Sequence, residues 1–190
     1  MKYDVTKKKT KFAERTLNDF SKVLFETLAE KRMENITIGE LCEKANYPRA
    51  TFYNYFDDIY DLLNYCWQRM AGEIVIDDYP SIPEKERTYV LFERCYAYLS
   101  RYRESIEKIM THNPMDGRFA ESLKKFLLEK IYQIIVNSPC SRKYKVPYEL
   151  MAQYYASTIQ TMLEWCFLKK EPMTEQQALN ALHDLLEGSL

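Results

Sequence analysis

The densest group of side chains that could do chemistry lies in residues 46–58, which read NYPRATFYNYFDD. The segment holds five aromatic rings among very few aliphatic residues. Phe52 and Phe56 are four residues apart and share one face of a helix, whereas Arg49 and Tyr53 fall on another. Phenol and guanidinium groups are good hydrogen-bond donors to phosphates. The pattern therefore predicts that the Phe rings enter the core and that the polar side chains face a partner rich in acceptors. Because aromatic residues at helical spacing are usually core, plain packing of the whole segment is the alternative.

A lysine-rich stretch precedes the first expected helix. Residues 1–52 contain eleven Lys or Arg against eight Asp or Glu, although the net charge of the whole chain is −1. Lysine ammonium groups pair with phosphates and release counterions from nucleic acid. We therefore predict that Lys7, Lys8, Lys9 and Lys11 contact DNA phosphates. The alternative is a disordered and solvated N-terminus.

Enzymatic and metal sites have little support in the sequence. The two histidines, His112 and His183, are far apart and do not stand at metal-ligand spacing with a cysteine or carboxylate pair. No Gly-rich loop that could cradle a phosphate occurs. The five cysteines are scattered and odd in number: Cys42, Cys66, Cys95, Cys140 and Cys166. We predict buried thiols in a reducing cytoplasm, no cofactor, no metal and no catalytic residue; a redox-sensing cysteine is the alternative.

The composition indicates a globular protein built from helices. Of 190 residues, 46% are hydrophobic and 29% charged, and only four are glycine. No apolar run approaches the roughly 20 residues that span a bilayer, and the N-terminus lacks the apolar core of a signal peptide. We expect a cytoplasmic, all-α protein that does not enter a membrane.

Hydrophobic residues recur at helical spacing along the whole chain and predict about nine helices. Six have expected bounds, which are residues 10–32, 38–45, 48–55, 59–77, 148–170 and 174–188. Three more helices are indicated by apolar residues at helical spacing within residues 91–102, 106–110 and 119–135. Thr37 with Glu40, and Thr174 with Gln177, fit capping boxes that open the helices after them.

Two short helices joined by a three-residue turn, after one long helix, form a helix-turn-helix pattern. Asn46 tolerates the left-handed conformation that ends a helix, and Pro48 suits the first turn of the next. Such a pair places its second helix in the major groove of DNA. Helix-turn-helix geometry also occurs in proteins that never contact DNA, so the pattern alone leaves that alternative open.

Residues 38–56, IGELCEKANYPRATFYNYF, resemble the signature of the TetR family of bacterial transcriptional regulators. That signature reads roughly [IV]-x-x-[IL]-A-x-x-A-G-V-S-x-G-[TS]-[LF]-Y-x-[HY]-F, followed by a charged turn and x-x-L-[LF]. The matching positions are Ala45, Thr51, Phe52, Tyr53, Tyr55, Phe56, Leu62 and Leu63. The resemblance covers about residues 10–65; beyond them it rests on chain length and helix number.

The resemblance implies an all-α homodimer with a DNA-binding domain over residues 1–57 and a helical regulatory and dimerisation domain over 58–190. Such proteins are non-enzymatic regulators, here expected to be a repressor, that bind a palindromic operator in double-stranded DNA. The helices at about 148–170 and 174–188 would form the dimer interface, although they could also simply close a monomeric bundle. Carried over by position, the residues expected at DNA are Thr37, Arg49, Ala50, Thr51, Tyr53, Asn54 and Tyr55.

Three positions depart from the family pattern. Asn46 replaces the glycine of the turn but tolerates the same conformation. Pro48 replaces a serine, so the next helix lacks a side-chain cap. Asp57 and Asp58 stand where many members place a lysine for a phosphate. The two carboxylates suit the N-terminus of a helix but would repel a nearby phosphate, which puts DNA contacts after Phe56 in doubt.

In the family a small molecule in the second domain swings the linking helix and releases the operator. The apolar, Met-rich and aromatic residues that could line such a pocket are Trp67, Met70, Cys95, Tyr98, Leu99, Tyr102, Met110, Phe126, Met151, Tyr155, Thr158 and Met162. No strong charge is directed among them, so we expect an uncharged or aromatic effector. Plain core packing of these side chains is one alternative. Another is a regulator of the same fold that is controlled by a protein partner.

Overall fold

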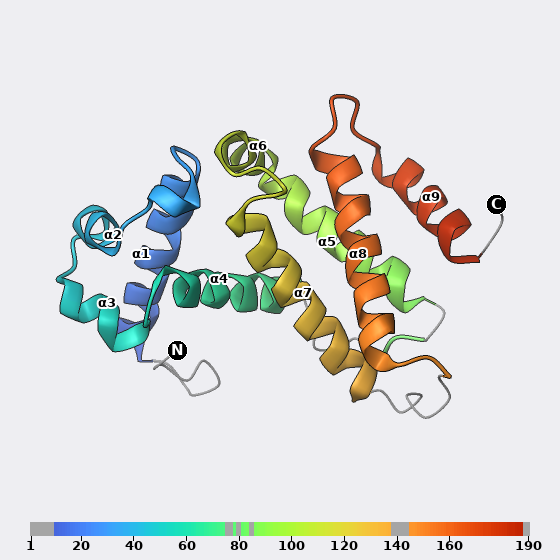
Figure 1. The fold of residues 1–190 in the computed structure, drawn as a ribbon, viewed down its shortest axis with the longest axis horizontal. Helices are drawn as coiled ribbons and strands as arrows, with labels where there is room; N and C mark the ends of the chain where they lie inside the picture. Colours follow the sequence, from blue (N-terminus) through green and yellow to red (C-terminus); the bar gives the residue numbers. More distant parts are fainter. Residues whose placement is uncertain (1–9, 75–77, 79–80, 84–85, 138–144, 188–190) are drawn as a thin grey trace. The chain divides into compact units, whose positions relative to one another are not determined.

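The computed structural model describes residues 10–74, 78, 81–83, 86–137 and 145–187. Within these residues the fold is all-α, as predicted, and contains no strand (Figure 1). The helices in chain order are α1 (Lys11–Leu28), the 3₁₀ helix η1 (Met33–Asn35), α2 (Ile38–Ala45), α3 (Arg49–Tyr55), α4 (Ile59–Glu73), α5 (Arg87–Arg101), α6 (Arg103–His112), α7 (Arg118–Val136), α8 (Tyr148–Phe167) and α9 (Glu175–Glu187).

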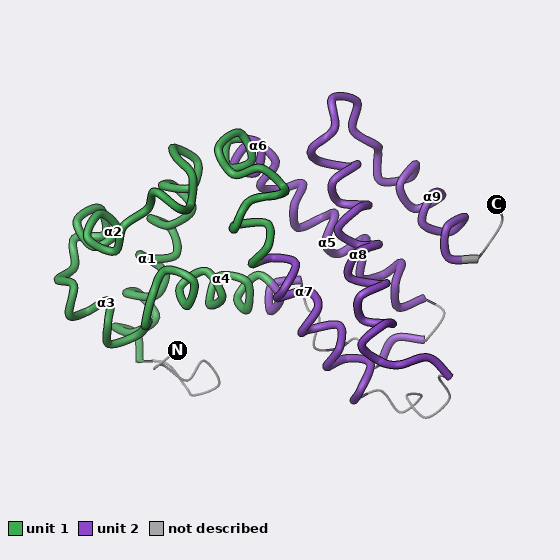
Figure 2. The backbone as a smooth tube through the Cα atoms, in the orientation of Figure 1, with its two compact units in different colours: residues 1–70, 108–122 green, residues 71–107, 123–190 purple. Residues whose placement is uncertain are grey.

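The chain forms two compact units, shown in different colours in Figure 2. The first unit contains the chain up to Met70 together with residues 108–122, and the second contains residues 71–107 and 123–190. Helices α4, α6 and α7 each continue from one unit into the other along the chain. The first unit therefore holds α1, α2, α3, most of α4, the end of α6 and the start of α7.

Local side-chain signals fix the helix ends of the first unit. The Thr37 hydroxyl accepts a hydrogen bond from the backbone N–H of Glu40 at 3.2 Å, as its capping role predicts. Asn46 ends α2 with φ 57° and ψ 45°, the left-handed conformation expected of it. Pro48 then stands at the N-cap of α3 without a side-chain cap. The predicted helix-turn-helix is confirmed as a structural element.

Three predicted boundaries are wrong at helix C-termini. Helix α4 ends at Glu73 and not at residue 77, since residue 74 already forms a turn. The first helix ends at Leu28 and not at residue 32, because the chain turns there and enters η1 before α2. Helix α8 ends at Phe167 and not at residue 170, and Leu168 forms its C-cap. The ends of α1 and α8 carry neither a glycine nor a proline that would have signalled the stop.

The core of the first unit is built around aromatic rings. Phe20 of α1 meets Phe52 of α3 edge to face, with ring centroids 5.3 Å apart, and Phe56 lies 6.4 Å from the same ring. All three side chains are completely buried. Edge-to-face pairs add to the energy of burial, so these rings hold α3 on α1.

The second unit has its own core, formed by α5, α8 and α9. Its fully or nearly buried members are Phe92, Met162, Cys166, Phe167, Ala178 and Leu182. Arg103 lies 4.6 Å above the Phe167 ring and donates to the Cys166 carbonyl at 3.4 Å. Thr174 and Gln177 form a reciprocal capping box at the start of α9, as predicted: each backbone N–H donates to the other side chain.

Large apolar side chains remain exposed on α8 and α9. Leu150, Tyr154 and Trp165 of α8 are 56%, 51% and 44% exposed, and Leu185 of α9 is 49% exposed. The three on α8 are spaced by four and eleven residues and therefore lie along one face. No helix among the described residues has the length and apolar character needed to cross a membrane.

Candidate nucleic-acid interface

Helix α3 presents two chemically different faces. Phe52 and the adjoining Phe56 are fully buried, whereas Tyr53 is 43% exposed, and Ala50 and Asn54 are exposed as well. The division of Phe inward and polar side chains outward follows the prediction. A seven-residue helix with one anchored and one polar face has the form needed to enter a groove of DNA.

The remaining aromatic residues of the segment are used in different ways. Tyr47 packs its ring 5.3 Å from Phe20 and donates its hydroxyl to Asp19 at 2.8 Å. The Tyr47 side chain therefore stabilises the turn before α3 through contacts inside the protein. Tyr55 and Thr51 are half-buried at the edge of the exposed face.

Two further predicted contacts lie at helix N-termini. Thr37 is exposed, and its hydroxyl oxygen caps α2. Lys11 is exposed at the first position of α1, after Thr10, whose hydroxyl caps Ala13 at 3.2 Å. Lys7, Lys8 and Lys9 lie outside the described residues.

Several cations counted in the basic surplus are paired within the protein. Lys31 contacts the Glu40 carboxylate at 2.8 Å, and Lys44 contacts Glu30 at 2.6 Å. The hydrogen bond from Lys31 lowers the pKa of Glu40, with Lys44 adding to the effect. The pairs join the turn after α1 to α2, so a charge count overstates the positive charge available to DNA. Exposed Arg15 likewise stands 3.8 Å from Asp19.

The two acidic residues after α3 belong to the cap of α4. The Asp58 carboxylate accepts from the N–H of Asp61 at 2.8 Å, and the Asp61 carboxylate accepts from the N–H of Asp57 at 3.0 Å. Carboxylates in this position stabilise the positive end of a helix. The departure from the family pattern therefore has a local structural role, which sequence reasoning had offered as one interpretation.

The predicted effector residues divide between the two units. Trp67, Met70 and Met110 belong to the first unit, and the other nine belong to the second. Trp67 is buried, donates its indole N–H to Ser122 at 3.1 Å and packs against Phe119 at 5.3 Å. In the first unit this side chain therefore has structural contacts.

The predicted effector residues of the second unit also differ in exposure. Cys95, Phe126 and Met162 are buried, whereas Tyr102 is 45% exposed. Tyr98, Leu99, Met151, Tyr155 and Thr158 are half-buried. Their role in binding an effector stays a prediction.

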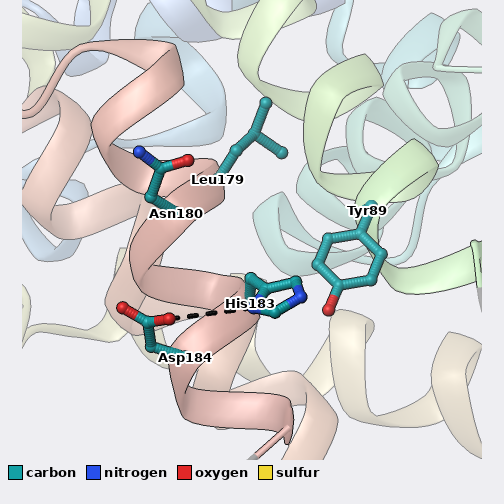
Figure 3. A pocket seen from close by; sticks show the side chains of 5 residues that line it. All are labelled: Tyr89, Leu179, Asn180, His183 and Asp184. Atoms are coloured by element: carbon teal, nitrogen blue, oxygen red, sulfur yellow. Dashed lines mark ion pairs between the residues drawn. The ribbon is translucent and has the colours of Figure 1, made fainter. Parts of the chain in front are cut away.

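A pocket of about 530 Å³ opens between α5 and α9 of the second unit (Figure 3). It is lined by Tyr89, Leu179, Asn180, His183 and Asp184, none of which was predicted to bind an effector. The His183 and Asp184 side chains are both exposed and stand 3.7 Å apart.

The described cysteines are unsuited to nucleophilic chemistry. Cys42, Cys66, Cys95 and Cys166 are free and buried, and Cys140 lies outside the described residues. Burial raises the pKa of Cys66 and of Cys95 to about 12 and that of Cys166 to about 11. These thiols are protonated at neutral pH, whereas the thiolate is the reactive form. Among the described residues no three His, Cys, Asp or Glu side chains converge as metal ligands.

Two solved structures share this fold. A putative TetR-family transcriptional regulator from Syntrophomonas wolfei superimposes with a TM-score of 0.67 and 19% identity, over 93% of this chain and 95% of that chain. A TetR-family regulator from Pectobacterium atrosepticum gives a TM-score of 0.51 and 19% identity, over 96% and 98%. The chain has the fold of TetR-family transcriptional regulators. No protein-family model and no curated protein matches the sequence, so the TetR-like assignment rests on the shared fold and on the residues of α2 and α3.

Asn113 is an important residue of this TetR-like fold that sequence reasoning missed. It follows α6, is 3% exposed, and accepts from the N–H of Met33 at 2.8 Å. Its amide also donates to the carbonyls of Leu28 at 2.9 Å and Lys31 at 3.2 Å. Asn113 thereby holds the turn that leads from α1 to the helix-turn-helix. The available signal in the sequence was an asparagine followed by Pro114, which resembles an ordinary helix stop.

Proposed function

We propose that this chain is a transcriptional repressor that binds a palindromic operator as a homodimer and releases it when an uncharged or aromatic small molecule binds. The observation that carries the proposal is the two-faced α3 helix. Its Phe52 is anchored in the core while Tyr53 and Asn54 are exposed on the opposite side. In this proposal residues 1–57 bind DNA and residues 58–190 regulate and dimerise.

The contacts on DNA would divide into two kinds. Tyr53 and Asn54 stand near the middle of the exposed face of α3, where side chains reach base edges or phosphates in the major groove. Thr37 and Lys11 stand at helix N-termini and would contact the backbone, which fixes the register of the protein on the duplex. Lys7, Lys8, Lys9, Ala50, Thr51 and Tyr55 complete the proposed interface.

The exposed apolar face of the second unit supports a dimer. Leu150, Tyr154 and Trp165 on α8, with Leu185 on α9, leave apolar area in water that a second copy would cover. One short helix reads only a few base pairs. Two copies would place two such helices about 34–36 Å apart, on half-sites one turn of DNA apart.

Release by an effector follows from the same geometry. A change of a few ångströms in the spacing of two recognition helices would prevent both from entering the groove together. An effector produces that change only if it binds the released conformation more tightly than the DNA-bound one. Helix α4 continues from the first unit into the second along the chain and is the proposed connection.

Fluorescence anisotropy with labelled DNA from beside the gene of this protein tests the proposal. We expect dimeric binding that weakens steeply with salt, because counterions are released. Tyr53→Ala should abolish specific binding, and Tyr53→Phe should reveal how much depends on the hydroxyl. Tyr132→Ala, in α7, is the matched control and should bind normally. Absence of binding to this DNA and to unrelated palindromes would instead favour a regulator controlled through a protein partner.

A further inference from the structure

Gly39 occupies a position where glycine is otherwise unfavourable. It is the second residue of α2, and a glycine inside a helix is less stable than alanine because it loses more backbone freedom on folding. No left-handed backbone conformation requires it, since no positive φ occurs there. What the glycine does provide is space, because no side chain stands beside the backbone there.

The space beside Gly39 is filled by Arg49. A Cβ atom placed on Gly39 would collide with Nη2 of Arg49, and it would lie 3.2 Å from Cζ and 3.4 Å from Nε of the same guanidinium. The head of the Arg49 side chain thus lies against the first turn of α2, although its Cα begins α3. The positive charge of Arg49 also opposes the rise in pKa that burial gives Cys42, another α2 residue.

Among the described glycines that lie in helices, only Gly39 has such a close neighbour. Gly72, a helical glycine in α4, has nothing within 4 Å of the position its Cβ would take. A guanidinium therefore packs against Gly39, whereas a Gly72→Ala substitution would place its Cβ atom in open space.

We propose that Gly39 is a positioning residue that seats the guanidinium of Arg49 on α2, so that Arg49 contacts a backbone phosphate and not a base edge. The inference rests on the proposed function and deepens it. The guanidinium of Arg49 lies beside Gly39 in the first turn of α2, two residues from Thr37, which is itself a proposed contact of the DNA backbone. A phosphate contact gives affinity and register but no sequence discrimination.

The first test is made without DNA. The Nε–Hε signal of Arg49 is identified in an NMR spectrum by its loss in Arg49→Lys. Gly39→Ala should shift that signal, because the guanidinium must leave its place beside residue 39, while Gly72→Ala should leave it in place. Because the colliding atom is the end of a flexible side chain, Gly39→Ala should keep or raise the melting temperature. If the Arg49 signal does not move in Gly39→Ala, then Gly39 does not position the Arg49 guanidinium, whether or not the protein binds DNA.

The second test uses the operator and a set of single base-pair changes. Arg49→Ala should weaken binding roughly tenfold, the loss of one charge-assisted hydrogen bond, and by the same factor for every sequence. It should also reduce the salt slope by about one. Gly39→Ala should lose part of this affinity, and should cost nothing further when added to Arg49→Ala.

The outcomes separate the inference from the function on which it rests. A loss of discrimination at one base pair in Arg49→Ala would overturn the phosphate assignment, because it would make Arg49 a base reader. An additive loss in the double variant would show that Gly39 acts independently of Arg49. The wild-type protein could bind no DNA while the Arg49 signal still moves in Gly39→Ala. That result would confirm that Gly39 positions the Arg49 guanidinium and would reject the DNA contact.

Discussion

Helices α3 and α8 both carry many aromatic residues, yet they expose different surfaces. On α3 the Phe52 ring is buried and the exposed aromatic, Tyr53, ends in a hydroxyl. On α8 the exposed large side chains are Leu150, Tyr154 and Trp165, of which only Tyr154 ends in a hydroxyl. The first surface suits a hydrated partner rich in acceptors, and the second suits a dry contact with another apolar surface.

The two units that hold these helices also differ in how completely their apolar side chains are covered. In the first unit the aromatic core and the buried Asn113 complete the fold within one chain, and every buried side-chain polar atom among the described residues has a partner. The second unit also has a buried core, but α8 and α9 leave Leu150, Tyr154, Trp165 and Leu185 exposed. We infer that the proposed DNA contacts stand on a unit whose core is closed within one chain, and that the second unit is completed by association.

Two neighbouring residues of α3 offer the largest test of this contrast. Phe52→Ala should lower the free energy of unfolding by about 4 kcal/mol, since it leaves a cavity where the ring met Phe20. Tyr53→Ala should lower that free energy by only about 1 kcal/mol, because the side chain is 43% exposed and its ring meets Phe52 at one edge. Urea unfolding measures both.

Tryptophan fluorescence allows the loss of stability to be assigned to one of the two units. Trp67 is buried in the first unit and Trp165 is exposed in the second, so Trp165→Phe leaves fluorescence that reports on the first unit alone. In that background Phe52→Ala should shift the unfolding midpoint strongly. Equal losses for Phe52→Ala and Tyr53→Ala would contradict the two-faced description of α3.

Asn113→Ala should have the next largest effect. It removes the acceptor of the Met33 N–H and the donor to the Leu28 carbonyl, both inside the protein. Leaving buried backbone groups without partners should cost about 3 kcal/mol. The Trp67 signal in urea measures the loss, with exposed Asn137→Ala as the control. A loss no greater than that of the control would mean that water replaces the amide and that the turn before α2 needs no anchor.

Association through α8 is tested by placing charge on its exposed face. Tyr154→Glu combined with Trp165→Glu should convert a dimer into a monomer, because two carboxylates would be buried without partners. Light scattering after size-exclusion chromatography measures the mass. Operator affinity should fall at least about 100-fold, since two half-sites are no longer engaged together. Val136→Glu, an exposed apolar position on α7, should leave the dimer intact. A dimer that survives the double substitution would place the interface elsewhere.

The parts of the fold that were predicted correctly depend on neighbouring residues. Thr37 caps a helix three residues away, and Asn46 adopts its left-handed conformation by itself, so both signals are visible in the sequence. The division of Phe52 from Tyr53 follows from helical spacing alone. These local signals were sufficient to predict α2, the turn and α3 closely.

The features that were missed depend on residues far apart in the chain. Asn113 bonds to Leu28, 85 positions away, and no local pattern indicates that partner. The bonds from Asn113 lie where α1 ends, and because they come from so far along the chain, the end of α1 was placed four residues too late. Spacing identified one face of each helix as apolar, but it could not show that Trp67 packs on Phe119 or that Tyr102 is exposed.

The smallest expected effect concerns the ion pairs that join α1 to α2. The hydrogen bond from Lys31 lowers the pKa of Glu40 below its ordinary value of 4.5. A carboxyl with a lowered pKa in the folded protein stabilises it above that ordinary value and loses the contribution as pH falls through the folded pKa. Because the pair is partly exposed, its contribution should be only about 0.5 kcal/mol.

Glu40→Gln isolates this contribution from those of the other carboxylates. Urea midpoints followed at Trp67 should fall more steeply for the wild type than for Glu40→Gln as the pH decreases from 6 to 3. The difference should shrink in about 1 M salt, where ion pairs at the surface are screened. Parallel pH profiles would show that Lys31 and Glu40 contribute no net stability, and the first unit would then be held by its aromatic core and Asn113 without help from charge.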